Sequence, residues 1–417
     1  MRVLWISNML MPDAANYLGK QTGVSGTWMI DISHMLAKRE GIELAIACVY
    51  GEKYKVFKMD GITYYLLPGN GKNMLFYTKK YEKIWKNINA EFKPDIVHLH
   101  GTEYSHGLSF LRACPKVKAV VSLQGLLNRI KDVDFGEIPK KIFLFNRTFR
   151  QSLRLNGEFE MHYLHNKNAK HETEILKRVS YVNGVNTWDT SLCKSINPNL
   201  KIFKLEYNLR DELYQSPKWD IEKVNRYTIF TNPGGTPLKG VHQLFKAVAL
   251  LKNKYPNIKI RVPGMGVNGK LKVTSAYTKY LAKLIKKLDI EENVVFMGRQ
   301  TGEEMCKNIL SANVTVIPSA IEGASLILRE AMFLGCPCIA SFRGGMADYI
   351  SDKVDGFLYD YQEYPYLAAR IDELFSNDEL AQQFSSNAIK KAQISHDRQK
   401  NLQDYLKMYQ QILEKDL

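Results

Sequence analysis

Residues Val316–Gly345 read VIPSAIEGASLILREAMFLGCPCIASFRGG, and this stretch decides the fold. The apolar run that ends at Ile317 predicts a buried strand, because a proline and a serine follow it at once. After a short loop, a helix is expected to open at Ala324 or Ser325 and to end at a glycine and a proline. The run Cys338–Ser341 predicts the next strand. The pattern is therefore strand, loop, helix, strand and loop.

Two carboxylates bracket the expected start of this helix. Glu322 precedes the helix, and Glu330 lies eight positions further along, where eight residues of helix rise by about 12 Å. The helix start, with Gly323 before it, offers backbone N–H groups and the positive end of the helix dipole, both of which suit a phosphate. The stretch therefore predicts an anion site with an acceptor carboxylate at each end. A nucleotide sugar has matching parts, namely sugar hydroxyls, a diphosphate and ribose hydroxyls.

The register of the whole stretch resembles the signature of retaining glycosyltransferases of family 4, which have the GT-B fold. A pair of glutamates eight positions apart is a weak signal, since solvated glutamates are common, whereas the complete register is specific. The resemblance is strong over 226–360 and looser over 1–205. The positions that fit are Pro318-Ser319, Glu322-Gly323, Glu330-Ala331, Gly335, Pro337, Ala340-Ser341 and Gly344-Gly345.

The resemblance implies an α/β fold with two Rossmann-like domains that face each other across a cleft. The N-terminal domain is expected at 1–205, with the C-terminal helix 398–417 packing back on it. The C-terminal domain is expected at 226–395, and the polar segment 206–225 connects the two. A chain of 417 residues is too long for one ordinary core, which also favours two domains.

A second glycine-rich loop, Asn232–Gly240, lies between a predicted strand and a helix with a clean apolar face. Its lysine, Lys239, matches the lysine that closes this loop in the resembling family. A lysine at a loop tip is usually only solvated, and the glycine-rich setting favours a functional role. The family commonly has an arginine five residues earlier, where this chain has Gly234. Arg343 is the hypothetical substitute.

By resemblance, the residues of the second half have distinct roles. Glu322 orients the transferred sugar and helps to stabilise positive charge at its anomeric carbon, while Lys239 neutralises the leaving diphosphate. Glu330 accepts the ribose hydroxyls, and Met297 and Gly298 lie beside the base. No metal or other cofactor is expected, because the lysine and the helix dipole take that role. The expected donor site is Gly235, Lys239, Met297, Gly298, Glu322, Gly323, Ala324, Ser325, Leu326 and Glu330.

The chain also opens with a strand, Arg2–Asn8, a loop of small residues and an amphipathic helix. This is a Rossmann-type opening, although a glycine turn can also serve tight packing alone. By resemblance, the loop faces the cleft near the donor phosphate and the acceptor. Gly23 and Gly26 are the matching residues.

Two further predicted strands end at the expected cleft. In the first, we expect His98 and His100 to face opposite sides of the strand; both are candidates for a structural role, and no third ligand is placed for a metal. His100 is retained as a cleft residue. The second strand ends at Gln124, where much of the family has a histidine beside the transferred sugar. Glutamine can bond a hydroxyl but cannot act as a base.

Composition limits the setting in which this protein works. The net charge of +15 favours an anionic partner, such as a phosphorylated substrate, nucleic acid or an acidic lipid surface, although it also serves solubility. No apolar run is long enough to span a membrane, and the apolar N-terminus is too short for a signal peptide. The six cysteines form no Cys-x-x-Cys pair and are expected to be reduced core thiols in the cytoplasm.

The segment 138–154 is unusual because it has five basic residues, three phenylalanines and no acidic residue. This composition fits a helix at an anionic membrane surface. The alternative, an amphipathic helix packed on its own domain, is about equally favoured. No motif for binding RNA or DNA accompanies the segment.

The sequence thus predicts a metal-independent retaining transferase that moves a hexose-type sugar from a nucleotide-diphosphate sugar to a saccharide or lipid-linked acceptor. The resemblance places it in the assembly of surface polysaccharides, in the cytoplasm or at the inner face of the cell membrane. Two rival functions stay open. One is an epimerase that uses nucleotide sugars, and the other is a non-catalytic module that binds them.

Overall fold

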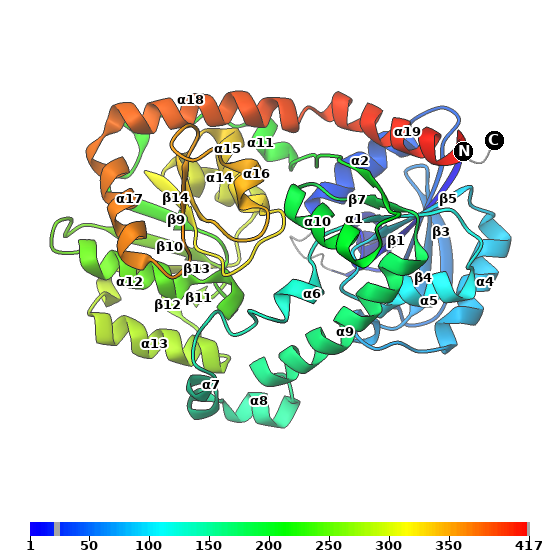
Figure 1. Cartoon of the computed structure of the whole chain (residues 1–417), viewed down its shortest axis with the longest axis horizontal. Coiled ribbons are helices and arrows are strands. Elements are labelled where there is room, and N and C mark those ends of the chain that lie inside the picture. Colours follow the sequence, from blue (N-terminus) through cyan, green and yellow to red (C-terminus); the bar gives the residue numbers. More distant parts are fainter. Residues whose placement is uncertain (21–25, 415–417) are drawn as a thin grey trace. The chain divides into compact units, whose positions relative to one another are not determined.

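The computed structural model describes residues 1–20 and 26–414, and the chain forms two compact units within it (Figure 1). Unit 1 contains residues 1–131, 164–210 and 396–417, and unit 2 contains residues 132–163 and 211–395. The chain therefore leaves and re-enters each unit, and a contiguous first domain does not describe it.

Unit 1 is built on an eight-stranded sheet with the strand order β3-β4-β2-β1-β5-β6-β7-β8. Neighbouring strands are parallel except β3 and β4, which are antiparallel. A mostly parallel sheet is expected to be buried on both faces, which explains why these strands are almost continuously apolar. The strands are β1 Arg2–Ser7, β2 Glu43–Gly51, β3 Lys55–Met59, β4 Ile62–Pro68, β5 Ile96–His100, β6 Ala119–Ser122, β7 Tyr181–Asn183 and β8 Lys201–Phe203.

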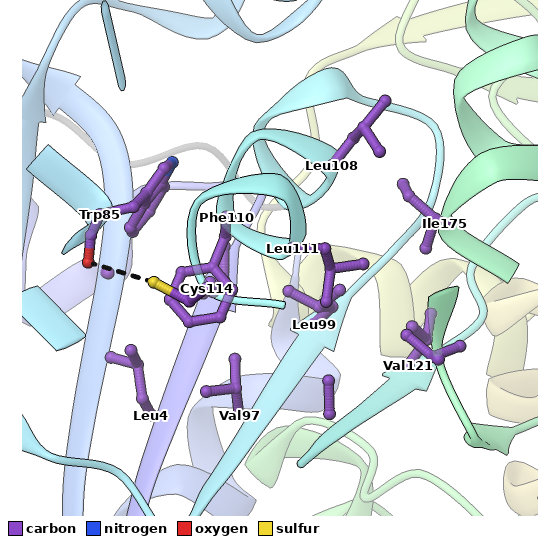
Figure 2. Packing of buried hydrophobic residues seen from close by; sticks show 14 of the residues in the cluster. Leu4, Trp85, Val97, Leu99, Leu108, Phe110, Leu111, Cys114, Val121 and Ile175 are labelled. Carbon is purple, nitrogen blue, oxygen red and sulfur yellow. Dashed lines mark hydrogen bonds between the residues drawn. The ribbon is translucent and has the colours of Figure 1, made fainter. Parts of the chain in front are cut away.

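Helices cover both faces of this sheet, and alternate strand residues form two separate cores. On one face, Leu4, Val97 and Leu99 point toward Phe110 and Leu111, as Figure 2 shows. Val3, Trp5 and Ile96, which alternate with these residues on the strands, belong to the second core. The helices are α1 Pro12–Tyr17, α2 Thr27–Ala37, α3 Gly71–Met74, α4 Lys80–Phe92, α5 Ser105–Ala113, α6 Leu127–Ile130, α10 Thr187–Ile196 and α19 Arg398–Glu414, together with most of α9 Glu158–Arg178.

The C-terminal helix α19 belongs to unit 1, where buried hydrogen bonds hold it to the sheet. Trp5 Nε1 donates to Tyr409 Oη at 2.9 Å, and the same hydroxyl lies 2.7 Å from His98 Nδ1. One tyrosine thus satisfies the polar atoms of two strands, β1 and β5. For the helix predicted at 398–417, the structure describes the part from Arg398 to Glu414.

Unit 2 has a six-stranded parallel sheet with the order β13-β10-β9-β14-β15-β16, and a small hairpin of β11 and β12. All residues of β9, β14 and β15 are buried, as expected for the centre of a parallel sheet. The strands are β9 Thr228–Thr231, β10 Lys259–Pro263, β11 Gly266–Val267, β12 Lys270–Leu271, β13 Val294–Gly298, β14 Val314–Ile317, β15 Cys338–Ser341 and β16 Phe357–Tyr359.

The helices of unit 2 alternate with these strands. Its last two helices, α17 and α18, are separated at Asn377. The helices are α7 Lys140–Asn146, α8 Phe149–Arg154, α11 Asp211–Gln215, α12 Val241–Leu251, α13 Ala276–Leu288, α14 Gly302–Leu310, α15 Leu326–Leu334, α16 Met346–Tyr349, α17 Tyr364–Ser376 and α18 Asp378–Ser395, with short 3₁₀ turns at Ile221–Lys223, Pro237–Lys239 and Glu291–Asn293.

Residues 132–163 pack on unit 2, although the sequence assigned them to the first domain. Two side chains from this segment cap the start of α13. Gln151 Oε1 accepts the backbone N–H of Ala276 at 2.7 Å, and Glu158 Oε1 accepts that of Tyr277 at 3.0 Å. These bonds satisfy amides that a helix start leaves without an intrahelical partner, so they hold the segment in place.

Each large sheet has one point where the direction of chain winding reverses. In unit 1 the chain moves from β1 to β2 on one side and from β5 to β6 on the other. In unit 2 it moves from β9 to β10 on one side and from β14 to β15 on the other. Ligands of open α/β sheets bind at the carboxyl ends of the strands at such a switch point. The structure therefore offers two places for a site, one in each unit.

All six cysteines are free and buried. Within residues 1–20 and 26–414, none of the helices has the length and apolar character needed to cross a bilayer.

Replacing Tyr409 with phenylalanine is expected to lower the free energy of unfolding by about 2–4 kcal/mol, because it leaves two buried groups without their partner. The denaturant midpoint measures this change. Tyr17→Phe is the matched control, since Tyr17 is 48% exposed and stacks on Phe57 through its ring. Equal midpoints for the two variants would show that the hydroxyl of Tyr409 does not hold α19.

Candidate functional site

At the switch point of unit 2, the structure brings the two predicted catalytic residues together. Lys239 Nζ lies 2.7 Å from Glu322 Oε2, and Ser319 Oγ donates to the same oxygen at 3.2 Å. The lysine follows β9 and the glutamate follows β14. The side chains are 36% and 15% exposed, so both remain open to solvent. The lysine and the carboxylate thus neutralise each other.

The two residues meet because the loops that carry them are in contact. Gly240 has φ +65° and a hypothetical Cβ there would lie 1.7 Å from the carbonyl oxygen of Pro318, so only glycine fits. Next to it, the backbone N–H of Ala320 donates to the Leu238 carbonyl at 2.8 Å. The glycine after the lysine is therefore what allows this approach.

A third loop, which follows β15, supports Glu322 from its backbone. The N–H of Gly345 donates to the Glu322 carbonyl at 2.9 Å. Gly344 has φ +69°, and a Cβ there would lie 2.2 Å from the same carbonyl oxygen. The paired glycines of the sequence pattern thus hold the loop that carries the glutamate.

The helix of the opening stretch begins as expected, with Ser325 at its N-cap. Ser325 Oγ accepts the backbone N–H of Leu328 at 3.3 Å, and α15 starts at Leu326. Gly323 and Ala324 precede the cap in the loop. The first helical turn contains no acidic residue, which suits an anion there. Glu330, about one turn into α15, is only 1% exposed.

Two other predicted donor residues lie at the end of an edge strand. Met297 and Gly298 end β13, and Gly298 has φ +71°. The carbonyl oxygens of both are occupied, since Gln300 Nε2 donates to that of Met297 at 3.0 Å and the N–H of Gly264 to that of Gly298 at 2.6 Å.

Gly234, where this chain departs from the family pattern, lies close to two side chains. A Cβ there would lie 2.9 Å from Met265 Cε and 3.0 Å from Val241 Cγ1, so a larger residue would need both side chains to shift. At the adjacent predicted donor residue, Gly235, a Cβ would meet only Met265, at 4.0 Å. The hypothetical substitute, Arg343, lies 3.3 Å from Glu137 Oε1 and 3.6 Å from Asp360 Oδ1. Binding of a phosphate by Arg343 would have to compete with these two carboxylates.

The switch point of unit 1 has a cluster of amides and a carboxylate. Asn8, which follows β1, donates through Nδ2 to Gln124 Oε1 at 2.8 Å. A Cβ on Gly101 would lie 2.5 Å from Glu103 Oε2 and 3.3 Å from Gln124 Cδ, so these side chains converge on that glycine. Among the described residues, Glu103 Oε2 and Gln124 Nε2 are buried and have no hydrogen-bond partner. Two polar atoms here are thus left for a ligand.

Burial raises the pKa of Glu103 to about 7, and the nearby charge of Glu172 adds to the effect. Backbone N–H groups, including that of Gly125, bond the carboxylate and limit the rise. Glu172 itself is held by Thr102 and by the backbone of α6. Glu103 therefore changes its charge close to neutral pH, whereas most glutamates are ionised there.

His98 and His100 do not face opposite sides of β5, and that expectation is wrong. Residues two apart on a strand point to the same face, and the two rings stack with centroids 4.2 Å apart. Burial lowers the pKa of His100 to about 3, so its ring is neutral. His98 bonds Tyr409 and Ser122, which makes its role structural. His100 is 2% exposed and stacks on Trp5.

Of the two predicted glycines of the first loop, only Gly26 is described, because Gly23 lies outside the described residues. Gly26 has φ +83° and immediately precedes α2. A Cβ there would lie 1.7 Å from Met9 Sδ, so the glycine is required for packing.

One group of possible metal ligands is found in the described part of the chain. Asp13, His34 and Asp60 bring three ligand atoms within 4.8 Å of one another. His34 Nε2 lies 2.7 Å from Asp13 Oδ2, and Tyr64 donates to the same oxygen. The hydrogen bond to His34 lowers the pKa of Asp13 and raises that of the imidazole, as expected for an ion pair. These groups satisfy one another, and we assign them no metal.

Comparison with known proteins addresses the second unit most directly. Residues 218–391 match the family described as "Glycosyl transferases group 1". This region of unit 2 is therefore similar to the group 1 glycosyltransferases. The resemblance to retaining GT-B enzymes of family 4 is therefore confirmed.

Individual group 1 relatives match over limited lengths. The D-inositol 3-phosphate glycosyltransferase of Corynebacterium urealyticum is 32% identical over 142 residues, which are 34% of this chain and 33% of that protein. In three of the curated relatives that the chain matches, it spans between 33% and 46% of their length.

Solved structures match over nearly the whole chain and show the fold. Sucrose-phosphate synthase of Thermosynechococcus elongatus has a TM-score of 0.72 at 14% identity, and the match covers 99% of both chains. HepE of Anabaena, in complex with UDP-glucose, has a TM-score of 0.67 at 17% identity, covering 99% of this chain and 100% of that one. The predicted GT-B class, α/β with two Rossmann-like domains, is thus confirmed.

Sequence reasoning missed two residues of the cluster in unit 1, Asn8 and Glu103. Both directly follow strands, and the switch-point rule would have found them if the strand order had been known. Sequence shows where β1 and β5 end, but it does not show that they are neighbours. The sequence therefore contains the residues at the strand ends but does not show the strand order that brings them together.

Substituting the two members of the ion pair is expected to have opposite effects on the binding of UDP. Lys239→Met removes the cation that a diphosphate needs and should weaken binding by about 10- to 100-fold. Glu322→Gln releases the lysine from its partner and should leave the dissociation constant equal or lower. Isothermal titration calorimetry measures both. A loss with Glu322→Gln as large as with Lys239→Met would show that the carboxylate itself supports nucleotide binding, which would contradict the expectation that it only competes for the lysine.

Proposed function

We propose that this protein transfers a hexose-type sugar from a nucleotide-diphosphate sugar to a saccharide or lipid-linked acceptor, with retention at the anomeric carbon. The observation that carries this proposal is the Lys239–Glu322 pair at the switch point of unit 2. A cation, a carboxylate and the start of α15 follow adjacent strand ends there. A diphosphate and the sugar attached to it need these three kinds of group at one place.

In this mechanism, the leaving group is stabilised by charge that the chain already holds. Lys239 turns from Glu322 to the diphosphate, and the N–H groups at the start of α15 bind its oxygens. The bond between the anomeric carbon and the diphosphate oxygen breaks, and the acceptor oxygen bonds the carbon on the same face. The departing diphosphate oxygen takes the acceptor's proton. No metal is needed, because the lysine and the helix supply the positive charge.

Once the lysine has turned away, the carboxylate of Glu322 is available to the sugar. It orients the hydroxyls and helps to stabilise positive charge at the anomeric carbon. Glu330 accepts the ribose hydroxyls, which requires α15 to expose a carboxylate that is only 1% exposed in this structure. The backbone of Met297 and Gly298 lies beside the base and contacts it through N–H groups.

We assign the acceptor to the cluster of unit 1. The amide of Gln124 donates to an acceptor hydroxyl, and the carboxylate of Glu103 accepts from one. Both atoms are unpartnered and buried among the described residues, and such atoms cost free energy unless a ligand satisfies them. Neutral amides and one carboxylate suit a polyol better than a phosphate, which separates this cluster chemically from the one in unit 2.

The comparisons support a nucleotide-sugar donor. HepE, whose fold this chain shares, is solved with UDP-glucose. The relative from Corynebacterium urealyticum is named for transfer to D-inositol 3-phosphate. For this chain we propose an acceptor in surface polysaccharide assembly, at the cytoplasmic face of the cell membrane.

Two rival functions make different predictions. An epimerase would convert or release the nucleotide sugar without any acceptor. A non-catalytic module would bind the nucleotide but show no turnover. The intact pair of Lys239 and Glu322 favours catalysis, because a module that only binds needs no carboxylate beside its diphosphate cation.

A panel of UDP-, GDP- and ADP-hexoses, offered with lipid-linked saccharides, is expected to give one donor that is consumed only when acceptor is present. NMR of the product should show the anomeric configuration of the donor. Glu322→Gln should lower kcat by at least about 100-fold while UDP still binds. Consumption of the donor without acceptor would instead favour the epimerase, and binding without any turnover would favour the module.

The pH dependence of the acceptor KM is expected to depend on Glu103. Its pKa of about 7 means that the accepting carboxylate forms as the pH rises through 7, so the acceptor KM should fall between about pH 6 and 8. Glu103→Gln should raise the acceptor KM and remove this dependence, while the donor KM changes little. A pH dependence that survives the substitution would exclude Glu103 as the acceptor's partner.

A further inference from the structure

Unit 2 displays a surface of large apolar side chains on the segment 138–157. Leu144 is 60% exposed, Phe145 80%, Phe149 84%, Leu153 74% and Leu155 70%. Single exposed apolar residues are ordinary, but five within twelve positions form a group. We call these five residues and their basic neighbours the apolar–basic surface.

These side chains face outward because the opposite sides of the same helices are packed on the unit. The segment forms two short helices, α7 and α8, and not the single amphipathic helix that the sequence suggested. Phe143 packs on Phe135, with ring centroids 5.3 Å apart, and α7 packs against α13. In α8, Thr148 and Gln151 form a capping box, and Gln151 also caps α13. The buried side is thus fixed to the unit, and the exposed residues cannot turn inward.

The surface is also strongly basic. Four of its basic residues are exposed: Lys140, Lys141, Arg150 and Arg154. A fifth, Arg147, pairs with Glu160. No acidic residue occurs between Ile138 and Gly157 in the sequence. The partner that complements this surface is therefore both apolar and anionic.

We propose that the apolar–basic surface docks on a bilayer of anionic lipids. Aromatic and leucine side chains enter the boundary between headgroups and acyl chains, and the lysines and arginines bind headgroups at that depth. Long basic side chains can reach the headgroups while their stems lie along apolar surface. A protein partner fits less well, because the cores of protein interfaces are poor in lysine. This inference does not require the proposed transfer reaction.

Docking through this segment would also fix the donor loop relative to the bilayer. Gly136 has φ +57°, and a Cβ there would lie 2.4 Å from the carbonyl oxygen of Pro237, in the 3₁₀ turn that contains Lys239. Tyr361 Oη donates to the Gly136 carbonyl at 2.8 Å, and Glu137 pairs with Arg343. The chain that leads into α7 thus rests directly on the loop of the predicted diphosphate cation.

Co-sedimentation with vesicles tests the proposal on the full chain. The wild type should bind vesicles of 30% phosphatidylglycerol in phosphatidylcholine and should not bind pure phosphatidylcholine at the same lipid concentration. Binding should weaken as salt is raised. Failure of the wild type to bind the anionic vesicles would overturn the proposal.

Two variants separate the apolar and the charged contributions. Leu144→Ser/Phe145→Ser/Phe149→Ser should lower vesicle affinity by at least about tenfold. Neutralising the four exposed bases to glutamine should lower it by more than about a hundredfold. The control for the first is Leu250→Ser/Val354→Ser/Ile394→Ser, three exposed apolar residues of the same unit. The control for the second is glutamine at four exposed lysines elsewhere in the unit: Lys283, Lys286, Lys287 and Lys390.

Each outcome decides the proposal. Both controls should bind as the wild type does, and circular dichroism with a thermal melt verifies that every variant is folded. Equal losses in the surface variants and their controls would show that only net charge or general exposure matters, which would overturn the proposal. Concentration-dependent self-association that the serine variant abolishes, without vesicle binding, would assign the surface to a second copy of this chain. None of these measurements needs turnover, so failure of the transfer reaction would be recognised separately.

Discussion

The site of unit 2 depends on the contact of one glycine with one carbonyl. Gly240 approaches the Pro318 carbonyl so closely that no side chain fits between them, and this contact joins the loop after β9 to the loop after β14. The ion pair of Lys239 and Glu322 follows from that contact, because each residue lies one or a few positions from it. The paired glycines after β15 complete the arrangement by bonding the backbone of Glu322. Charge, loop and helix start are therefore placed by backbone packing, and the side chains themselves contribute little to their own positions.

The switch-point rule gives the two units a common logic and different chemistry. In unit 2, the loops at the reversal present a cation, a carboxylate and a capped helix start. In unit 1, the corresponding loops present Asn8, Gln124 and Glu103, which are amides and a carboxylate whose pKa is close to neutral. Phosphate needs fixed positive charge, whereas hydroxyls need donors and acceptors of modest charge. The proposed division of the donor and the acceptor between the units thus agrees with the kind of group that each sheet holds at its reversal.

How much the sequence could predict depends on whether a feature is local. Short sequence patterns predict the strands and the start of α15 at its serine cap. They also predict that Lys239 and Glu322 act at the same site. Most of these patterns lie in the stretch Val316–Gly345. The close packing around Gly234 could not be predicted in this way, because it depends on Met265, which is distant in sequence, as well as on Val241. The pairing of Arg343 with Glu137 is equally distant in sequence. The two histidines of β5 were misplaced for another reason, namely that the strand period was applied wrongly. Asn8 and Glu103 could not be joined until the order of the strands was known.

The segment 132–163 shows how strongly tertiary contacts override position in the sequence. It follows β6 of the first sheet, so sequence order places it in the first domain. Its side chains nevertheless cap α13, and its backbone rests on the 3₁₀ turn that contains Lys239. A helix start offers amides that need acceptors, and Gln151 and Glu158 supply them from over a hundred residues away. Because Gln151 makes its bond from the inward side of α8, Phe149 and Leu153 on the same helix remain exposed. The same capping bonds that fix the segment to the unit are thus the reason that its outer surface stays exposed.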